Sequence, residues 1–291
     1  MYKKNKLQIL LYILPTLLLA AVIYGISVVT LVGTSFTEWY IGSSPRFIGL
    51  DNYIEMFTGR NDFYKAFWNM VIWIGLQCVI HVSIGLLFAL ILSKQEWYWK
   101  IARTIYMIPN IISGAAVGML FIFILNPEYG AVNNIIRAIG FKDFSVNWFM
   151  DYNTAFFSVT MMWLPYAAVP SLLFLAEIFS IDRALYESAR IDGATDLQIN
   201  LYVVIPLLKN TIGTAVILAA TGMIQKLDII MVTTGGGPGN ETINLPMYIY
   251  KSALMDNNFG YANALGTFLI IFGISIIFTI RLIFKVGQSD M

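Results

Sequence analysis

Residues 67–92 read FWNMVIWIGLQCVIHVSIGLLFALIL and contain no Asp, Glu, Lys or Arg. The hydrocarbon core of a bilayer is about 30 Å thick, and a helix needs about 20 apolar residues to cross it. Lipid offers the backbone no hydrogen-bond partners, so an apolar run of this length spans the bilayer as a helix. The stretch therefore predicts a transmembrane helix.

Similar runs lie on both sides of this one. Four more lack acidic and basic residues, at 7–32, 104–125, 154–176 and 261–280. A sixth run, at 207–232, is weaker because Lys209 lies near one end and Lys226 and Asp228 lie near the other. The sequence predicts an all-α, polytopic membrane protein with six transmembrane helices, forming one membrane domain over residues 1–291.

The composition supports this class and excludes others. Only 12% of the 291 residues are charged and 58% are hydrophobic, whereas soluble domains carry about a quarter charged residues. A net charge of +1 gives no basic field for phosphate contacts, so we expect membrane lipid and no nucleic acid as a partner. One cysteine and one histidine, Cys78 and His81, exclude an internal disulfide and a Cys/His metal site.

The first run has the basic start of a signal peptide, but it exceeds the 7–15 residues of a signal core, so we interpret it as a membrane span. Six spans place both termini on one side. With the termini inside, the short cytoplasmic segments contain 11 of the 18 Lys and Arg residues. By the positive-inside rule, we expect both termini in the cytoplasm of a multi-pass cell-membrane protein.

A long polar segment follows the fourth run, at about 180–206. Its apolar spacing predicts a helix that ends at Asp192 and Gly193, because glycine tolerates the left-handed conformation at a helix C-terminus. Thr195 and Gln198 then form the pattern of a capping box for a second helix, and Pro206 suits the start of the fifth span. The segment predicts a helix, a turn and a helix.

The surface chemistry of this segment is distinctive. Ser188, Ala189, Gly193 and Ala194 are small, so the backbone of another protein could approach closely. Charged groups on its rim are Glu187, Arg190 and Asp192. The pattern is compatible with a small helix that inserts into a cleft on a partner protein, and equally with an ordinary interfacial loop.

The residues ESARIDGA (187–194), followed by Pro206, resemble the EAA loop of importer permeases of the ATP-binding-cassette (ABC) class. The second position is Ser188 where the family has alanine, and the last proline of the family's longer pattern is absent, with Asn210 nearby. The resemblance implies that this coupling loop, between the fourth and fifth spans, inserts into a cleft on an ATPase subunit.

Other segments extend the resemblance to the maltose-type carbohydrate uptake family. They are LPTLLL (14–19), SFTEW (35–39), FIGLDNYIEMF (47–57) and TTGGGPGNETINLPMYIY (233–250). The resemblance implies a permease core over about 67–285 and a transport subunit rather than an enzyme, moving a sugar or oligosaccharide across a bacterial membrane. It implies as partners a second homologous permease in a heterodimer, two ATPase subunits and an extracytoplasmic sugar-binding protein. ATP and Mg would lie on the ATPase subunits, so this chain would carry no cofactor.

The sequence GGGPG (235–239) differs from a nucleotide-binding loop. Such a loop continues with Gly, Lys and then Ser or Thr at the opening of a helix, whereas Pro238 and Asn240 stand here. We therefore expect a tight turn.

Lys226 and Asp228 are an oppositely charged pair near the end of a predicted span. Lys226 could extend to the membrane surface beside the carboxylate, or it could face a solute path, where intramembrane charges usually lie. Ala219, Met223 and Lys226 are spaced to share one helical face, and the resemblance places this face where maltose-type permeases contact sugar from their fifth span.

Trp163 and Tyr166 lie beside Pro165 and Pro170 in the fourth run. They could form an aromatic plate for a sugar ring, although packing alone would also explain them. Gln77 and His81, one turn apart in the second run, favour hydrogen bonds to a neighbouring helix over a proton relay.

Two other function classes compete with an ABC permease. An ion-coupled secondary transporter of a small polar solute would carry buried ionisable groups and inverted repeats. A membrane enzyme would need a cluster of acid, base or nucleophile. The sequence offers neither pattern, so permease function is the leading hypothesis.

Overall fold

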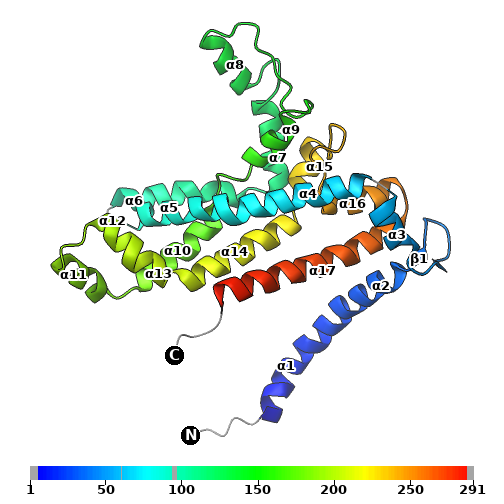
Figure 1. The fold of residues 1–291 in the computed structure, drawn as a ribbon, viewed down its shortest axis with the longest axis horizontal. Helices are drawn as coiled ribbons and strands as arrows, with labels where there is room; N and C mark the ends of the chain where they lie inside the picture. The colour runs from blue at the N-terminus through cyan, green and yellow to red at the C-terminus, as the bar shows by residue number, and fades with distance from the viewer. Residues whose placement is uncertain (1–5, 60, 94–96, 287–291) are drawn as a thin grey trace. The chain divides into compact units, whose positions relative to one another are not determined.

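The computed structural model describes residues 6–59, 61–93 and 97–286, and most of them are helical (Figure 1). The chain divides into two compact units. One comprises the residues up to 61 together with 248–270, and the other comprises 62–247 together with the residues from 271 onward.

The first unit contains the N-terminal helices and a small hairpin. Its elements are α1 (Lys6–Ala20), a π-helical turn (Ala21–Gly25), α2 (Ile26–Thr34), β1 (Thr37–Glu38), β2 (Arg46–Phe47), α3 (Asp51–Thr58) and a second π-helical turn (Lys251–Met255). Helix α16 (Leu245–Tyr250) ends in this unit, and α17 (Phe259–Phe284) begins in it. The hairpin pairs Thr37 with Phe47 in antiparallel register.

Buried amide side chains hold this unit together. Asn52 donates from Nδ2 to the backbone oxygens of Ser35, at 2.8 Å, and Thr37, at 2.9 Å. Asn263 donates to Thr34 Oγ1 at 2.7 Å. Because these bonds join α3 and α17 to the end of α2 and the start of β1, they fix the point where the first apolar helix ends.

The second unit contains the remaining helices. They are α4 (Asn61–Leu76), a π-helical turn (Gln77–His81), α5 (Val82–Leu92), α6 (Trp97–Met107), a 3₁₀ turn (Ile108–Ile111), α7 (Gly114–Ile124), α8 (Ala131–Ala138), α9 (Ala155–Met161), α10 (Ala168–Ser180), α11 (Arg183–Ile191), α12 (Asp196–Ile199), a π-helical turn (Asn200–Val204), α13 (Ile205–Leu207), α14 (Lys209–Ile224) and α15 (Asp228–Thr233).

Within the described residues, four helices are long and apolar enough to cross a membrane. They are Leu10–Thr34, Asp62–Leu92, Lys209–Thr233 and Phe259–Phe284. Apolar side chains of the first one are exposed, such as Leu11 and Val29, as expected of a surface that faces lipid. These helices confirm the membrane class and four of the predicted runs. The short helices α3 and α8 occupy the connecting regions 33–66 and 126–153.

The predicted continuous third span, 104–125, is wrong in one respect. The chain forms α6 with its 3₁₀ turn and then α7, and the two pieces meet at an angle of 96°. Pro109 lies in the 3₁₀ turn, and Ser113 caps α7 by accepting from the Ala116 N–H at 3.3 Å. Because a proline removes a donor and a capping serine starts a new helix, the two residues divide the run. Counted as one broken span, the pair brings the spans to five.

The predicted fourth span, 154–176, is also not continuous. Helix α9 ends at Met161 and α10 begins at Ala168, and neither piece is long enough to cross a membrane by itself. Pro165 lies in the gap, where it lacks the N–H that a helix would use. Pro170 lies in the first turn of α10, where the loss is harmless. The structure thus gives four or five spanning helices, against the six expected.

The α5 and α10 helices pack at close range. A Cβ added at Gly85 would lie 2.6 Å from Pro170 Cβ, and Ser171 Oγ donates to the Gly85 carbonyl at 3.0 Å. Small residues allow this approach and an interhelical hydrogen bond reinforces it, as is common in membrane proteins. The contact holds α10 in place although the helix before it is broken.

The segment 180–206, here called the coupling segment, has the predicted helix, turn and helix. Asp182 caps α11 by accepting from the Ala184 N–H at 3.0 Å, and Gly193 has φ +81°. The Ala194 N–H donates to the Ala189 carbonyl at 3.0 Å, which closes α11 as a left-handed cap. Thr195 and Gln198 form the expected capping box of α12.

Candidate translocation path and coupling surface

Two adjoining cavities lie where three helices of the second unit are interrupted. The Trp163 cavity, of about 270 Å³, is lined by Trp163, Ile112 and Asp228 among others. The His81 cavity, of about 180 Å³, is lined by Gln77, His81 and Ala219 among others. Asn110, Tyr166 and Lys226 line both cavities. Each of these three residues belongs to a different helix break, at 108–113, 162–167 and 225–227.

The broken helices free backbone carbonyls, and side chains from other helices satisfy them. His81 Nδ1 lies 3.0 Å from the Leu164 carbonyl oxygen, so this ring nitrogen must carry the hydrogen. Asn244 Nδ2 donates to the Lys226 carbonyl at 2.6 Å. Such replacement bonds are what allows a helix to be interrupted at membrane depth. The hydrogen bond predicted for His81 is thus present and runs to the break between α9 and α10, whereas Oε1 of its predicted companion Gln77 makes none among the described residues.

Two polar atoms at the cavities have no such partner. Trp163 Nε1 and Gln77 Oε1 are buried without a hydrogen bond among the described residues. A buried donor or acceptor without a partner costs about 1–3 kcal/mol, and such atoms call for an explanation. Because both residues line the cavities, a polar solute there could complete their hydrogen bonds.

The charged pair predicted near the fifth span lies at the Trp163 cavity. Helix α14 ends at Ile224, so Lys226 lies in the connection to α15, whose first residue is Asp228. In the described part of the chain, Lys226 and Asp228 form no ion pair with each other or with other residues. Both line the same cavity, so both charges are available to a solute.

The Asp228 carboxylate lies against the N-terminus of α7. A Cβ added at Gly114, the first residue of α7, would overlap this carboxylate. The N-terminal end of a helix attracts negative charge through its free N–H groups and its dipole. The glycine therefore lets Asp228 settle at a favourable site.

The predicted face of Ala219, Met223 and Lys226 is only partly realised. Ala219 lines the His81 cavity, whereas Met223 is completely buried and lines neither cavity. The expectation assumed one continuous helix to Lys226, but α14 ends at Ile224, so Lys226 lies outside the helix that carries Ala219 and Met223.

The two residues of the predicted aromatic pair differ in exposure and packing. Trp163 is 6% exposed and meets Trp73 edge to face, with ring centroids 5.3 Å apart. Tyr166 is 39% exposed and lines both cavities. Trp163 is thus held rigidly by packing, while Tyr166 is the more accessible ring. Asn110, which the sequence reasoning missed, joins them; its position next to Pro109, in a helix-breaking context, was the available signal.

The predicted coupling residues lie together on the surface of the coupling segment. All seven are exposed or partly exposed around the turn: Glu187, Ser188, Ala189, Arg190, Asp192, Gly193 and Ala194. At Gly193, nothing lies within 4 Å of an added Cβ. Arg190 forms a weak, exposed ion pair with Asp196 at 3.4 Å. The surface is therefore not covered by the other parts of the chain that the structure describes.

The GGGPG sequence is the tight turn that was expected. Gly235, Gly236 and Gly239 adopt positive φ angles, which glycine tolerates without strain. After the turn, Glu241 accepts an ion-pair hydrogen bond from Lys65 at 2.7 Å, and its carbonyl accepts from Asn69 at 2.9 Å. The turn is thereby fastened to α4.

Long apolar helices, together with interrupted helices around mostly apolar cavities that carry a few polar groups, are typical of the class of membrane transport proteins. The family comparison gives the particular kind. Residues 81–288 match the model of the "Binding-protein-dependent transport system inner membrane component" family, and the chain belongs to this family.

Individual relatives agree with the family assignment. The chain is 32% identical to the probable ABC transporter permease protein YurN of Bacillus subtilis, over the full length of both chains. It is 31% identical to the sulfoquinovosyl glycerol transport system permease protein SmoG of Agrobacterium fabrum, covering 94% of this chain and 89% of that protein.

A solved structure has the same fold. A chain of the bacterial alginate ABC transporter, in complex with an alginate pentasaccharide-bound periplasmic protein, superposes with a TM-score of 0.85 at 25% identity and 99% coverage of both chains. The resemblance found in the sequence is confirmed: the chain is a membrane-bound ABC transporter permease, a transport component rather than an enzyme.

Proposed function

We propose that this permease imports a sugar or oligosaccharide through the two adjoining cavities, driven by separate ATPase subunits. The observation that carries the proposal is the meeting of three helix breaks at Asn110, Tyr166 and Lys226. Apolar walls with a few polar groups suit a sugar, which has C–H faces and a ring of hydroxyls. The names of the relatives, which include sulfoquinovosyl glycerol and alginate transporters, support this substrate class.

The proposed assembly contains a second, homologous permease in a heterodimer, two ATPase subunits and an extracytoplasmic sugar-binding protein. In this assembly the chain has six spans, with the piece α9 to α10 as a broken fourth one, and both termini lie in the cytoplasm. The coupling segment then faces the cytoplasm between the fourth and fifth spans. Closure of the ATPase pair would move it as a rigid body and exchange inward for outward access.

The direct test is reconstitution of the chain with its candidate ATPase, second permease and binding protein, asking which glycan stimulates ATP turnover. We expect stimulation by one sugar or oligosaccharide class. Solute uptake that is driven by an ion gradient without ATP, together with ATP turnover that no glycan stimulates, would favour the alternative of an ion-coupled secondary transporter. No observation on the cavities favours that alternative, since Asp228 is their sole carboxylate among the described lining residues.

Lys226 gives a sharper test of the path. In the Lys226→Met variant we expect uptake to fall at least fivefold or sugar preference to change, because the variant removes a charge from both cavities. A matched control is Lys142→Met, which changes an exposed lysine in the loop after α8. Unchanged uptake and unchanged preference in Lys226→Met would contradict the proposed path.

A further inference from the structure

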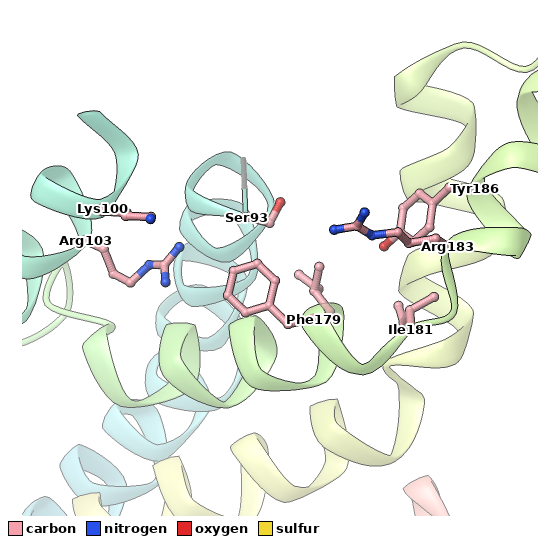
Figure 2. Close-up of a pocket in the computed structure, with 8 residues that line it drawn as sticks. Ser93, Lys100, Arg103, Phe179, Ile181, Arg183 and Tyr186 are labelled. Carbon is pink, nitrogen blue, oxygen red and sulfur yellow. The ribbon is translucent and has the colours of Figure 1, made fainter. Parts of the chain in front are cut away.

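A third cavity of the second unit lies away from the proposed path. It has a volume of about 490 Å³ and lies between the end of α5, α6, the end of α10 and the start of α11. Among the residues that the structure describes, its lining includes Lys100, Arg103 and Arg183 and no acidic side chain. Figure 2 shows Lys100 and Arg103 on one side and Arg183 on the other, with their head groups turned toward the space between. We call this cavity the basic pocket.

The three cations of the basic pocket are not neutralised within the described part of the chain. Lys100 and Arg183 form no ion pair there. Arg103 Nη2 donates to the Leu92 carbonyl at 2.9 Å and the guanidinium lies over the Phe179 ring at 5.1 Å, so the side chain is held in place. Its Nε is buried without a partner. Three converging cations with a spare donor form a site for an anion.

Helix α6, which contributes Lys100 and Arg103 to the basic pocket, indicates which kind of anion would bind there. On α6, Trp97 (72% exposed), Ile101 (51%) and Ile105 (61%) recur every four residues and form an exposed apolar face, while Lys100 and Arg103 are turned away from it toward the pocket. A helix with a Trp-bearing apolar face and a basic face is typical of the membrane–water interface.

We propose that the basic pocket binds the headgroup phosphate of an anionic phospholipid, beside the coupling segment. Basic pockets between helices on the cytoplasmic side are suited to such headgroups. Phe179, which is 46% exposed, supplies an apolar floor for the glycerol end of the lipid. Tyr186 adds a hydroxyl at the rim, and burial raises its pKa, so it remains a donor. The position of the pocket at the inner surface rests on the proposed function.

The basic pocket joins the coupling segment to another helix. Arg183 and Tyr186 belong to α11, whereas Lys100 and Arg103 belong to α6. A phosphate held by both sets would tie the coupling segment to α6, the first piece of the broken third span. Bound lipid would therefore restrict the angle at which α11 meets a partner.

The test measures lipid binding by the full-length chain in neutral detergent, with native mass spectrometry and dioleoyl phosphatidylglycerol as the probe. We expect the Lys100→Gln/Arg183→Gln variant to bind this lipid about 30-fold more weakly, since each basic side chain contributes about a fivefold effect. The side chains of Lys100 and Arg183 make no hydrogen bond or ion pair in the described residues, so the variant should fold. The control is Arg281→Gln/Lys285→Gln, which removes the same charge outside the pocket and should change binding less than threefold. Equal binding by both variants would overturn the proposal.

Two further arms identify other occupants. If inorganic phosphate alone protects the wild-type chain against thermal unfolding as well as the lipid does, the site takes a free anion and the lipid proposal is wrong. The proposal is equally wrong if the pocket variant keeps its lipid but loses a copurifying ATPase, because the pocket would then belong to a protein interface. Lipid binding needs no transport, so a failure of the proposed import leaves this result unaffected.

Discussion

The coupling segment and the helix breaks around the cavities both interrupt helices, but they satisfy the freed backbone groups in different ways. In the coupling segment the partners are close in sequence: Thr195 with Gln198, and Ala194 with Ala189. At the breaks the partners are distant: the Leu164 carbonyl bonds to His81. The first region is exposed and self-sufficient, and the second is buried and depends on other helices. The difference suggests that the coupling segment is a rigid, exposed element. The helix breaks around the cavities, in contrast, can rearrange when their helices move.

The largest effect is expected at Gly193. Its φ of +81° disfavours Val, at a cost of roughly 1–2 kcal/mol, and its open surroundings leave room for a partner. We expect Gly193→Val and Gly193→Asn both to lower uptake at least tenfold while ATP turnover continues. Asparagine tolerates the left-handed conformation. The Gly193→Asn variant therefore keeps the backbone turn but adds a side chain on the surface that a partner would contact. Normal uptake by Gly193→Asn would show that only the turn matters and would contradict close docking.

His81 tests the buried region. We expect His81→Leu to destabilise the chain by about 1–3 kcal/mol, because the Leu164 carbonyl would be left buried without a donor. The measurement is the thermal unfolding midpoint in detergent. His81→Asn is the matched control, since its amide N–H₂ can replace the Nδ1 donor. If the leucine variant is as stable as the asparagine variant, the break does not depend on this bond.

The smallest effect on stability is expected at Gly114. Gly114→Ala should change the unfolding free energy by less than about 1 kcal/mol, since the clash is with the end of a flexible side chain and alanine favours a helix. Uptake should nevertheless fall a few-fold, because the Asp228 carboxylate is displaced from the α7 terminus. Gly75→Ala in α4, where nothing lies within 4 Å of the added Cβ, is the control. Equal uptake in both variants would show that the position of the Asp228 carboxylate does not matter for the proposed solute path.

The same comparison explains what the sequence could predict. The caps predicted for the coupling segment were accessible because their signals, at Gly193, Thr195 and Gln198, act over a few residues. The uncharged runs predicted the membrane helices, since length and apolarity decide insertion.

The helix breaks that form the two cavities were harder to predict from the sequence. Pro109 and Pro165 signalled irregularity, but a proline in a membrane helix is compatible with a bend or a complete break. Which one occurs depends on distant donors such as His81 and Asn244, and no local pattern identifies them. For the same reason the burial of Met223 and the role of Asn110 at the cavities emerged only from the fold.

In the proposed mechanism, a partner ATPase binds the coupling segment at its small exposed residues. The most direct measurement is cross-linking of the assembled transporter from a Ser188→Cys variant in a Cys78→Ser background, using a sulfhydryl-to-amine reagent. We predict a cross-link to the ATP-hydrolysing subunit, and none from Ser145→Cys, an exposed serine in the loop after α8. A transporter that imports its solute while the thiol introduced by Ser188→Cys forms no such cross-link and reacts freely with a water-soluble maleimide would contradict the account.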